Sequence, residues 1–344
     1  MTTLAYCAVE PDGRLHEDTL LVCDEVLPAL VDLVDAVHRE GGLVSAQMAH
    51  GGGFSKNRGL RGRRPKGPSF GINRLGAAVG MPFCDAMSEA DLEALVGAYR
   101  DAALLLTSAG VDALEIHMGH GYALCQFISP RTNRRTDRFG GSLLNRMRLP
   151  LQVLDAVRGV VGADVPVVAK LSVNEHIRGG LAADEGVEVA RMLDQAGIDG
   201  VVTSGGTSSM SPMDMLRGDS FLPAMIAAEP SWALRTAMRL AGPFMFPERP
   251  YEELYFLDDA LRVRDAVGCA VIYVGGASTA ASLERLMAEG MDFVQLGRAL
   301  LADPDLPRRV ADPAYVSPCT HCNRCVATIE RGVHCTERHR WEGA

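Results

Sequence analysis

Short apolar runs alternate with longer amphipathic segments along most of the chain. The runs are rich in Val, Ile, Leu and Ala, as buried parallel strands are, and the segments between them have the 3.6-residue period of helices. Seven runs predict strands: residues 1–6, 43–48, 112–117, 166–172, 199–205, 270–276 and 292–298. Repeated strand–helix units predict an α/β fold of the TIM (β/α)8-barrel type. A doubly wound sheet is the alternative, but no predicted strand is followed by G-x-G-x-x-G.

The helix predicted at residues 88–110 has recognisable ends. Ser88, followed three residues later by Asp91, resembles a capping box, in which the two side chains satisfy the first free backbone N–H groups. Gly110 stands where a left-handed residue commonly ends a helix. Such helices between the strands are expected to cover the outer face of the sheet.

The predicted barrel is incomplete on its N-terminal side. A closed barrel of this type needs eight strands, whereas the chain begins directly in the strand at residues 1–6. We therefore expect the first strand to be lacking and the barrel to be open between residues 1–6 and 292–298, with free edges that favour a homo-oligomer. The connections at residues 54–87 and 205–257 are long enough to form lids, and residues 216–246 in the second could be helical.

The composition is that of a soluble globular protein, with 47% apolar residues among 344. The net charge of −9 disfavours nucleic acid and anionic membranes as partners, so a small-molecule substrate is expected. No apolar run reaches the ~18 residues of a membrane span, and the N-terminus lacks the pattern of a signal peptide, which predicts a cytoplasmic location. The basic run at residues 58–67 is rich in Gly and is interpreted as a solvated loop.

The nine cysteines are unevenly distributed. Four of them form a C-x2-C-x2-C-x9-C pattern: Cys319, Cys322, Cys325 and Cys335. In a cytoplasmic protein such clustering indicates metal ligation rather than disulfides, and four thiolates could hold a [4Fe–4S] cluster or zinc. The pattern divides the chain into a barrel domain, residues 1–312, and a Cys-rich segment, residues 313–344.

Three polar rings are crowded at the end of the strand predicted at residues 112–117. They are His117, His120 and Tyr122, within "EIHMGHGYALC". Two neutral imidazoles can donate N–H groups to one carbonyl oxygen, and a phenol close by can supply a proton. The two histidines could instead be a zinc or copper pair, although no third ligand is evident nearby, or could be satisfied by the backbone.

A second group of residues predicts an anion site at other strand ends. Gly275 and Gly276 follow one predicted strand, and Gly297 with Arg298 ends the next, where backbone N–H groups and a guanidinium can hold a phosphate. The alternative is that these glycines only make tight turns. Lys170 projects from a barrel strand, where an anionic partner would explain a cation that is costly to bury alone.

The stretch at residues 115–148, together with "VVAKLS", "VGG", "LGRALLADPDLP" and "CTHCNRC", resembles the old yellow enzyme family. The nearest branch is the one with 2,4-dienoyl-CoA reductase and trimethylamine dehydrogenase. The resemblance implies a TIM-type barrel that carries FMN, takes hydride from NADH or NADPH, and reduces an electron-poor alkene. It also implies that His117 and His120 polarise the carbonyl group of the acceptor, while Tyr122 protonates its α-carbon.

The resemblance also assigns residues to the cofactor. Gln47 matches the amide that bonds the flavin pyrimidine edge, and Lys170 stands where the family usually has arginine beside flavin N1 and O2. His50 matches a histidine of the same strand end but could equally be a loop residue. The FMN phosphate would be held by four residues: Gly275, Gly276, Gly297 and Arg298.

Two other functions stay open from the sequence. One is oxidative demethylation of a small amine, although that chemistry needs an aromatic pocket and only 6% of the residues are aromatic. The other is a noncatalytic barrel remnant whose Cys cluster binds a metal and a partner. In iron–sulfur relatives the last Cys gap is slightly longer and the cluster passes electrons onward, so a separate electron-transfer partner is possible here.

Overall fold

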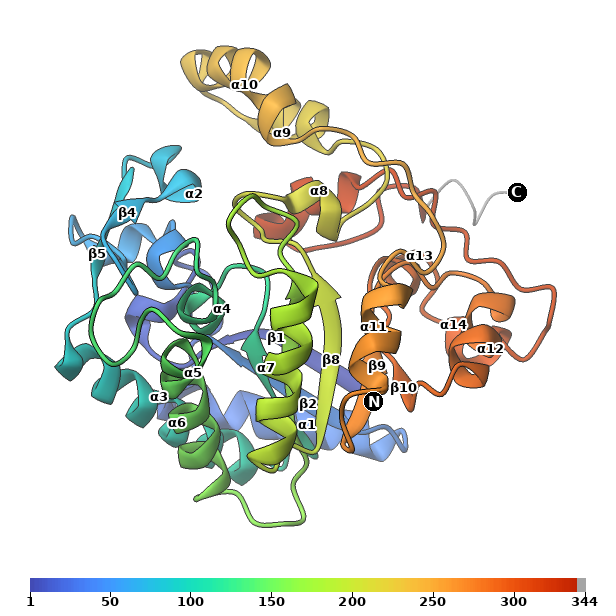
Figure 1. The fold of residues 1–344 in the computed structure, drawn as a ribbon. Helices are drawn as coiled ribbons and strands as arrows, with labels where there is room; N and C mark the ends of the chain where they lie inside the picture. The colour runs from blue at the N-terminus through green and yellow to red at the C-terminus, as the bar shows by residue number, and fades with distance from the viewer. Residues whose placement is uncertain (339–344) are drawn as a thin grey trace.

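A parallel sheet of seven strands forms the centre of the protein (Figure 1). The computed structural model describes residues 1–338 of the chain. The strands are β1 (Thr2–Ala8), β2 (Val44–Ala49), β6 (Ala113–Met118), β7 (Val167–Asn174), β8 (Gly200–Gly205), β9 (Ala270–Tyr273) and β10 (Phe293–Val294). They are hydrogen-bonded in the order β1-β2-β6-β7-β8-β9-β10. All seven strands predicted from the sequence are therefore confirmed.

The sheet is an open, curled half-barrel. Among residues 1–338 no backbone pairing joins β1 to β10, so the expected opening between these two strands is confirmed. Gln295, which directly follows β10, donates from Nε2 to Oε1 of Glu115 on β6 at 3.3 Å. Three strands lie between β6 and β10 in the sheet, so the sheet must curl for these side chains to meet.

Fourteen α-helices surround this sheet within the described part of the chain. They are α1 (Leu27–Arg39), α2 (Arg74–Ala77), α3 (Glu89–Ser108), α4 (Ala123–Ile128), α5 (Leu143–Arg146), α6 (Arg148–Arg158), α7 (Ala183–Gln195), α8 (Pro212–Met215), α9 (Leu222–Ala228), α10 (Trp232–Met245), α11 (Leu257–Arg264), α12 (Ala280–Ala288), α13 (Arg298–Ala302) and α14 (Leu306–Arg309). None of these helices is both long and apolar enough to cross a lipid bilayer.

The ends of α3 are those that the sequence predicts. The Ser88 side chain accepts a hydrogen bond from the Asp91 N–H at 3.2 Å, and Asp91 Oδ2 accepts one from the Ser88 N–H at 2.8 Å. Gly110 has a φ of +87°, which ends the helix in the left-handed region that glycine adopts without strain. Helix α3 then packs against α6 on the outside of the sheet.

The connection after β2 contains a small three-stranded sheet. Its strands are β3 (Lys66–Gly67), β4 (Gly71–Ile72) and β5 (Phe83–Ala86), in the order β3-β5-β4. Basic residues of this connection form ion pairs, Arg63 with Asp12 at 2.8 Å and Lys66 with Asp91 at 2.5 Å. These pairs are at least partly exposed, in agreement with the interpretation of residues 58–67 as a surface loop.

The C-terminal segment packs over the carboxyl ends of β8 and β9. The Ser317 N–H donates to the Ser278 carbonyl at 2.7 Å, and the amide of Asn323 donates to the carbonyls of Leu216 and Asp219 at 2.8 and 2.9 Å. A 3₁₀ helix, η5, follows at Arg324–Arg331. Asn323 is buried, so these bonds fix the segment to the connection between β8 and α9.

Strands β2, β6 and β8 are buried along their whole length. Apolar side chains fill both faces of these strands, which is why they read as nearly continuous apolar runs in the sequence. The buried polar exceptions are Ser45 and Gln47 in β2, Glu115 and His117 in β6, and Thr203 and Ser204 in β8. Because a buried polar group without a partner is costly, each of these residues is expected to bond to another polar group.

Candidate active site at the strand ends

A tight turn after β6 brings the three predicted catalytic rings together. His120 has a φ of +56° and Gly121 one of +79°, so the chain reverses direction directly after the strand. The His120 N–H donates to Ser172 Oγ on β7 at 2.8 Å, which fixes the turn to the neighbouring strand. Gly119 is required here, because a Cβ at this position would lie 3.0 Å from the Ser172 nitrogen.

His117 lies between the other two rings. Its centroid is 4.7 Å from that of Tyr122 and 5.0 Å from that of His120, and both contacts are edge to face. Tyr6 from β1 packs against Tyr122 from the other side at 5.2 Å. The structure therefore joins the three residues that the sequence predicts to work together, and β1 supports the group.

All three rings are uncharged at neutral pH and can donate hydrogen bonds. Burial lowers the pKa of His117 well below its usual value, and burial, followed by the charge of Lys170, lowers the pKa of His120 to about 3. Burial also raises the pKa of Tyr122. His117 Nδ1 accepts the Gly119 N–H at 3.2 Å, so its proton is on Nε2, from which it can be donated to a ligand.

Ser204 at the end of β8 holds the second imidazole. Its Oγ lies 2.8 Å from His120 Nε2, which leaves Nδ1 as the ring nitrogen without a partner among the described residues. Within residues 1–338 no third His, Cys, Asp or Glu is placed to complete a metal site with the two histidines. The geometry thus favours a pair of hydrogen-bonding imidazoles over the zinc or copper alternative.

A buried carboxylate organises the two residues assigned to the flavin ring. Oε2 of Glu115 accepts a hydrogen bond from Gln47 Nε2 and lies 3.4 Å from Lys170 Nζ, while its Oε1 accepts from Gln295. Glu115 is 1% exposed, so its carboxylate has little contact with water, and these protein partners supply the hydrogen bonds that water would otherwise provide. Gln295 Oε1 is buried without a hydrogen-bond partner in the described part of the chain.

The predicted phosphate site follows β9 and β10, which pair in parallel through Tyr273 and Val294. The backbone N–H groups of Gly276 and Gly297 have no hydrogen-bond acceptor among residues 1–338. A Cβ at Gly297 would meet nothing within 4 Å, so there is open space beside this turn. Gly276 has a φ of +75° and lies against the ring of Tyr255, so its own packing also requires glycine.

These observations agree with an FMN site. Free N–H donors, open space at Gly297 and an unbonded amide oxygen at Gln295 are the features that an anionic, polar cofactor would satisfy. Gln47 and Lys170 would hold the ring system, and the turns after β9 and β10 would hold the phosphate. These assignments stay predictions.

Arg298 makes contacts that the sequence does not indicate. One guanidinium nitrogen, NH1, donates to the Arg217 carbonyl at 2.8 Å and to Asn323 Oδ1 at 2.5 Å. Its role toward a phosphate stays a prediction. In this structure Arg298 ties the strand-end turn to the C-terminal segment.

Both ring nitrogens of His50 contact residues of nearby loops. Its Nδ1 accepts the Gly52 N–H at 2.9 Å, and its Nε2 lies 2.9 Å from Glu10 Oε1. Both ring nitrogens therefore have partners within the protein, and the ring is 2% exposed. Of the two interpretations open from the sequence, the structure favours the loop residue.

The four C-terminal cysteines lie close together in the structure. All four border one small cavity beside Arg298: Cys319, Cys322, Cys325 and Cys335. Among residues 1–338 no group of three or more His, Cys, Asp or Glu residues is placed to hold a metal ion. Burial raises the pKa of Cys319 and of Cys325. A metal centre at these four cysteines therefore stays a prediction.

Comparison with known proteins identifies the family of the chain. Residues 1–208, more than half of the chain, match the family model described as NADH:flavin oxidoreductase / NADH oxidase family. The chain belongs to this family. Its members include the old yellow enzyme type that the sequence resembles, and the protein is accordingly an FMN-dependent NAD(P)H oxidoreductase.

Individual relatives differ in length and in the reaction after which they are named. The chain is 37% identical over 340 residues to a 4,4'-dithiodibutanoate disulfide reductase of Rhodococcus erythropolis, covering 98% of this chain and 83% of that protein. It is 29% identical over 304 residues to an NADH oxidase of Thermoanaerobacter brockii, covering 87% of this chain but 41% of that protein. A solved 2-naphthoyl-CoA reductase superposes with a TM-score of 0.75 at 24% identity over 93% of this chain and 46% of that one, which shows that the two proteins share a fold.

Three polar residues of the site escaped the sequence analysis: Glu115, Ser204 and Gln295. Glu115 gives one detectable signal, because it stands two residues before His117 and alternate residues of a strand share a face. Ser204 and Gln295 give no signal in the sequence, since serine and glutamine are common at strand ends. Their partners are 84 and 180 residues away in the chain.

Proposed function

We propose that the protein reduces electron-poor alkenes conjugated to a carbonyl group, using hydride that bound FMN receives from NADH or NADPH. The observation that carries this proposal is the arrangement of His117 between His120 and Tyr122 with all three rings neutral. An acceptor with one carbonyl oxygen and one carbon to be protonated needs both kinds of donor at one place.

Each ring has a separate role in this proposal. His117 Nε2–H donates to the carbonyl oxygen of the acceptor, and His120, held by Ser204, is the second donor or orienting group. These donors stabilise the negative charge that develops on the oxygen when hydride arrives at the β-carbon. Tyr122 then gives its phenolic proton to the α-carbon, which completes the reduction.

A second candidate is the reduction of an organic disulfide. The observation that favours it is the 37% identity to a 4,4'-dithiodibutanoate disulfide reductase over 98% of the chain. Hydride delivered to one sulfur would break the S–S bond and release a thiol and a thiolate, and Tyr122 would protonate the thiolate. Tyr122 has the same role in both reactions. In the disulfide, however, the two histidines could contact only a terminal carboxylate, which gains no charge when the S–S bond breaks.

The two candidates can be separated with reduced, FMN-loaded protein in an anaerobic stopped-flow instrument. Reoxidation is followed after mixing with 2-cyclohexenone or with 4,4'-dithiodibutanoate at matched concentrations. The alkene proposal expects the larger rate constant with the enone, and expects His117→Ala to slow that reaction far more than any reaction with the disulfide. Faster reoxidation by the disulfide, unaffected by His117→Ala, would establish the second candidate instead.

A further inference from the structure

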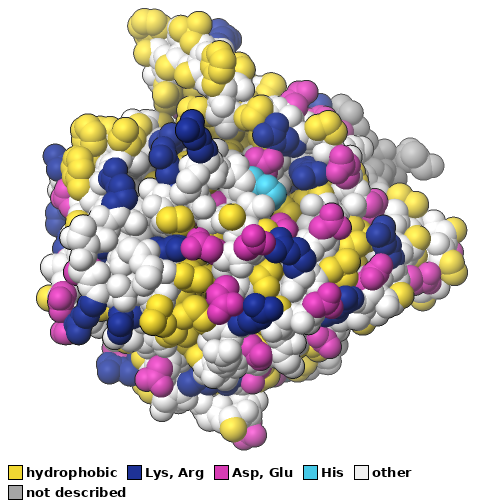
Figure 2. Space-filling model, in the orientation of Figure 1, with side chains coloured by type: hydrophobic (Ala, Val, Ile, Leu, Met, Phe, Trp, Pro, Cys, Tyr) yellow, Lys and Arg dark blue, Asp and Glu magenta, His cyan; other side chains and the backbone are white. Residues whose placement is uncertain are grey.

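Helices α9 and α10 form a hairpin that stands away from the barrel (Figure 1). The hairpin belongs to the connection between β8 and β9 and leaves from the carboxyl end of β8. Figure 2 shows hydrophobic side chains over much of this projection. Because soluble proteins rarely keep such a surface uncovered, the hairpin needs a partner.

The outward face of α10 is apolar along its whole length. Trp232, Leu240 and Phe244 are 74%, 74% and 89% exposed, and their spacing of eight and four residues puts them on one side of the helix. The other exposed residues of this face are uncharged: Ala233, Thr236, Ala237 and Ala241. Packing against the protein therefore does not explain these aromatic and aliphatic side chains.

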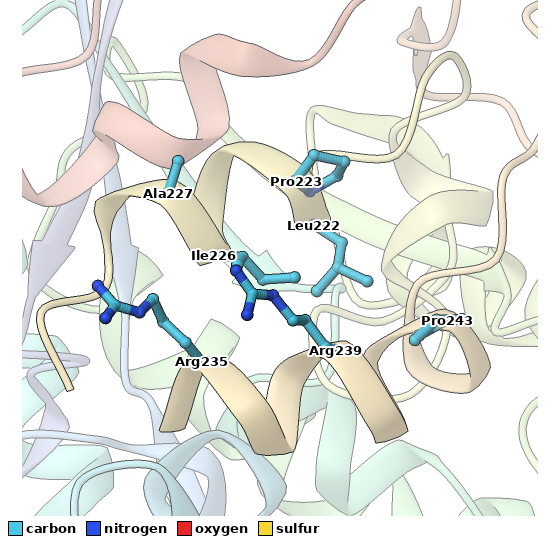
Figure 3. Close-up of a pocket in the computed structure, with 7 residues that line it drawn as sticks. All are labelled: Leu222, Pro223, Ile226, Ala227, Arg235, Arg239 and Pro243. Atoms are coloured by element: carbon cyan, nitrogen blue, oxygen red, sulfur yellow. The ribbon is translucent and has the colours of Figure 1, made fainter. Parts of the chain in front are cut away.

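Two arginines border this apolar face. Arg235 and Arg239 rise from α10 into a groove of about 570 Å³ between the two helices, with Leu222 and Ile226 on its α9 side (Figure 3). Neither guanidinium forms an ion pair with a residue in 1–338, in contrast to the basic loop after β2. No acidic residue occurs between residues 230 and 247, although the whole chain has a net charge of −9.

We propose that the α9–α10 hairpin binds the surface of an anionic lipid bilayer. Trp232, Leu240 and Phe244 enter the boundary between headgroups and acyl chains, and Arg235 and Arg239 bind lipid phosphates. An amphipathic helix with Trp, Phe and Leu on one face and arginines at its border is the form that lies in a membrane interface.

The shape of the region favours a bilayer over a protein partner. The apolar residues are on a convex projection, which a deformable lipid surface accepts without a matching groove (Figure 1). The negative charge of the rest of the protein is screened beyond a Debye length of about 10 Å, so the local arginines determine attraction at the tip. Binding in this way brings the carboxyl ends of the strands, where His117 and Tyr122 lie, toward the membrane.

The proposal can be tested by vesicle flotation of the FMN-loaded protein. Vesicles of phosphatidylcholine with a quarter phosphatidylglycerol are compared with vesicles of phosphatidylcholine alone. We expect flotation with the anionic vesicles at low salt, at least fivefold weaker flotation with neutral ones, and weakening as salt rises. In a Trp341→Phe background, Trp232 is the only tryptophan, and its fluorescence should shift to the blue when the protein binds.

Matched variants distinguish membrane binding by this surface from nonspecific adsorption of the protein to vesicles. Phe244→Asp and Leu240→Asp should each lower vesicle binding about tenfold or more, and Arg239→Gln should lower it about fivefold on anionic vesicles only. Leu144→Asp, at a 62% exposed leucine of α5, is the control and should bind as the parent protein does. Unchanged FMN content in all variants shows that the barrel is intact.

Three outcomes would overturn the proposal. The first is no flotation with either vesicle, and the second is equal flotation of Phe244→Asp and Leu144→Asp. The third is a dimer in light scattering that Phe244→Asp dissociates, without any vesicle binding, which would assign the face to a second copy of the chain. Activity toward enones is a separate readout, so failure of the proposed reaction does not affect this test.

Discussion

The turn after β6 and the Cys-rich segment both carry closely spaced reactive residues, yet only the turn is organised for chemistry. In the turn, the Ser172 and Ser204 side chains bond to His120, and the three rings contact one another. In the segment, the four thiols border one cavity without coming together as ligands. Sequence spacing alone gave both regions a strong prediction.

The difference arises from what fixes each backbone. The turn is anchored at both ends in regular structure, between a buried strand and α4, and neighbouring strands supply its partners. The segment is held mainly by Asn323 and by the bond between Ser317 and Ser278. Its cysteines lie before, within and after the 3₁₀ helix η5 rather than at a sheet edge. Reactive residues become a site where several elements fix them at once.

The strongest test of this comparison is removal of the Tyr122 hydroxyl. Tyr122→Phe should slow reoxidation by an α,β-unsaturated ketone by about 10²-fold or more, because the carbon that gains negative charge loses its proton donor. Reduction by NAD(P)H needs no proton from the protein and should stay nearly unchanged. Stopped-flow measurement of the two half-reactions separates them.

His117→Ala serves as the comparison for that experiment. A carbonyl donor acts in both the ground and transition states, so this variant should weaken binding of phenolic ligands about tenfold as well as slow the alkene step. Equal slowing of both half-reactions by Tyr122→Phe would mean that the tyrosine positions the nucleotide or the cofactor, and the assigned role would be wrong.

A smaller effect is expected from Glu115, whose carboxylate lies 3.4 Å from the Lys170 ammonium. Glu115→Gln keeps the shape but removes a negative charge, so the field of Lys170 should favour the reduced, anionic flavin more strongly. The midpoint potential of bound FMN should rise by about 30 mV, which is a tenfold change in the equilibrium constant of a two-electron couple.

Lys170→Met should shift the midpoint potential in the opposite direction. A potential that responds to neither substitution would show that Glu115 and Lys170 do not act on the cofactor.

The buried histidines should make stability depend on pH. The pKa of His120 is lowered from 6.5 to about 3, mainly by burial, so between these values the unfolded chain binds a proton that the folded chain does not. Stability is therefore complete above pH 6.5 and is lost as the pH falls through this window, by about 2 kcal/mol at pH 5. That loss corresponds to roughly 2–4 °C in thermal denaturation.

Substitution at His120 checks this assignment. His120→Asn should flatten the change in Tm between pH 7 and pH 5, whereas substitution of the exposed His334 by Asn should leave the slope as it is. If both variants keep the full slope, other groups cause the pH dependence.

The smallest effect is expected in the Cys-rich segment. Cys325→Ser should change each half-reaction by less than about twofold, because no described residue links this thiol to the turn after β6. Asn323→Ala is the matched variant, since it removes three hydrogen bonds that hold the segment to the protein and should make the segment more sensitive to proteolysis. A tenfold loss of activity in Cys325→Ser would show that the two regions are coupled.

Much of the fold follows from local patterns in the sequence. Apolar runs of strand length predict the seven strands, and segments with a period of 3.6 residues predict the helices between them. The Ser88 and Asp91 side chains predict the start of α3. These features depend on residues within a few positions of each other, so a single sequence contains them. The family resemblance came from a contiguous stretch for the same reason.

The sequence alone also determined which residues would carry the chemistry at the β6 turn. His117, His120 and Tyr122 lie within six positions, so one turn was enough to bring them together. It did not determine the metal site, because four thiols converge only if the backbone between them turns inward, and spacing does not specify that.

Only the tertiary structure decided the partners of these residues. Strand register puts Gln47 beside Glu115 and His117 beside Lys170, and curling of the sheet brings Gln295 to Glu115 from the far edge. Register and curvature result from pairings over long separations in the chain, which no local pattern encodes. The exposure of Trp232 and Phe244 was also decided by the tertiary structure. An apolar helix face has the same sequence pattern whether the fold buries it or leaves it exposed to water.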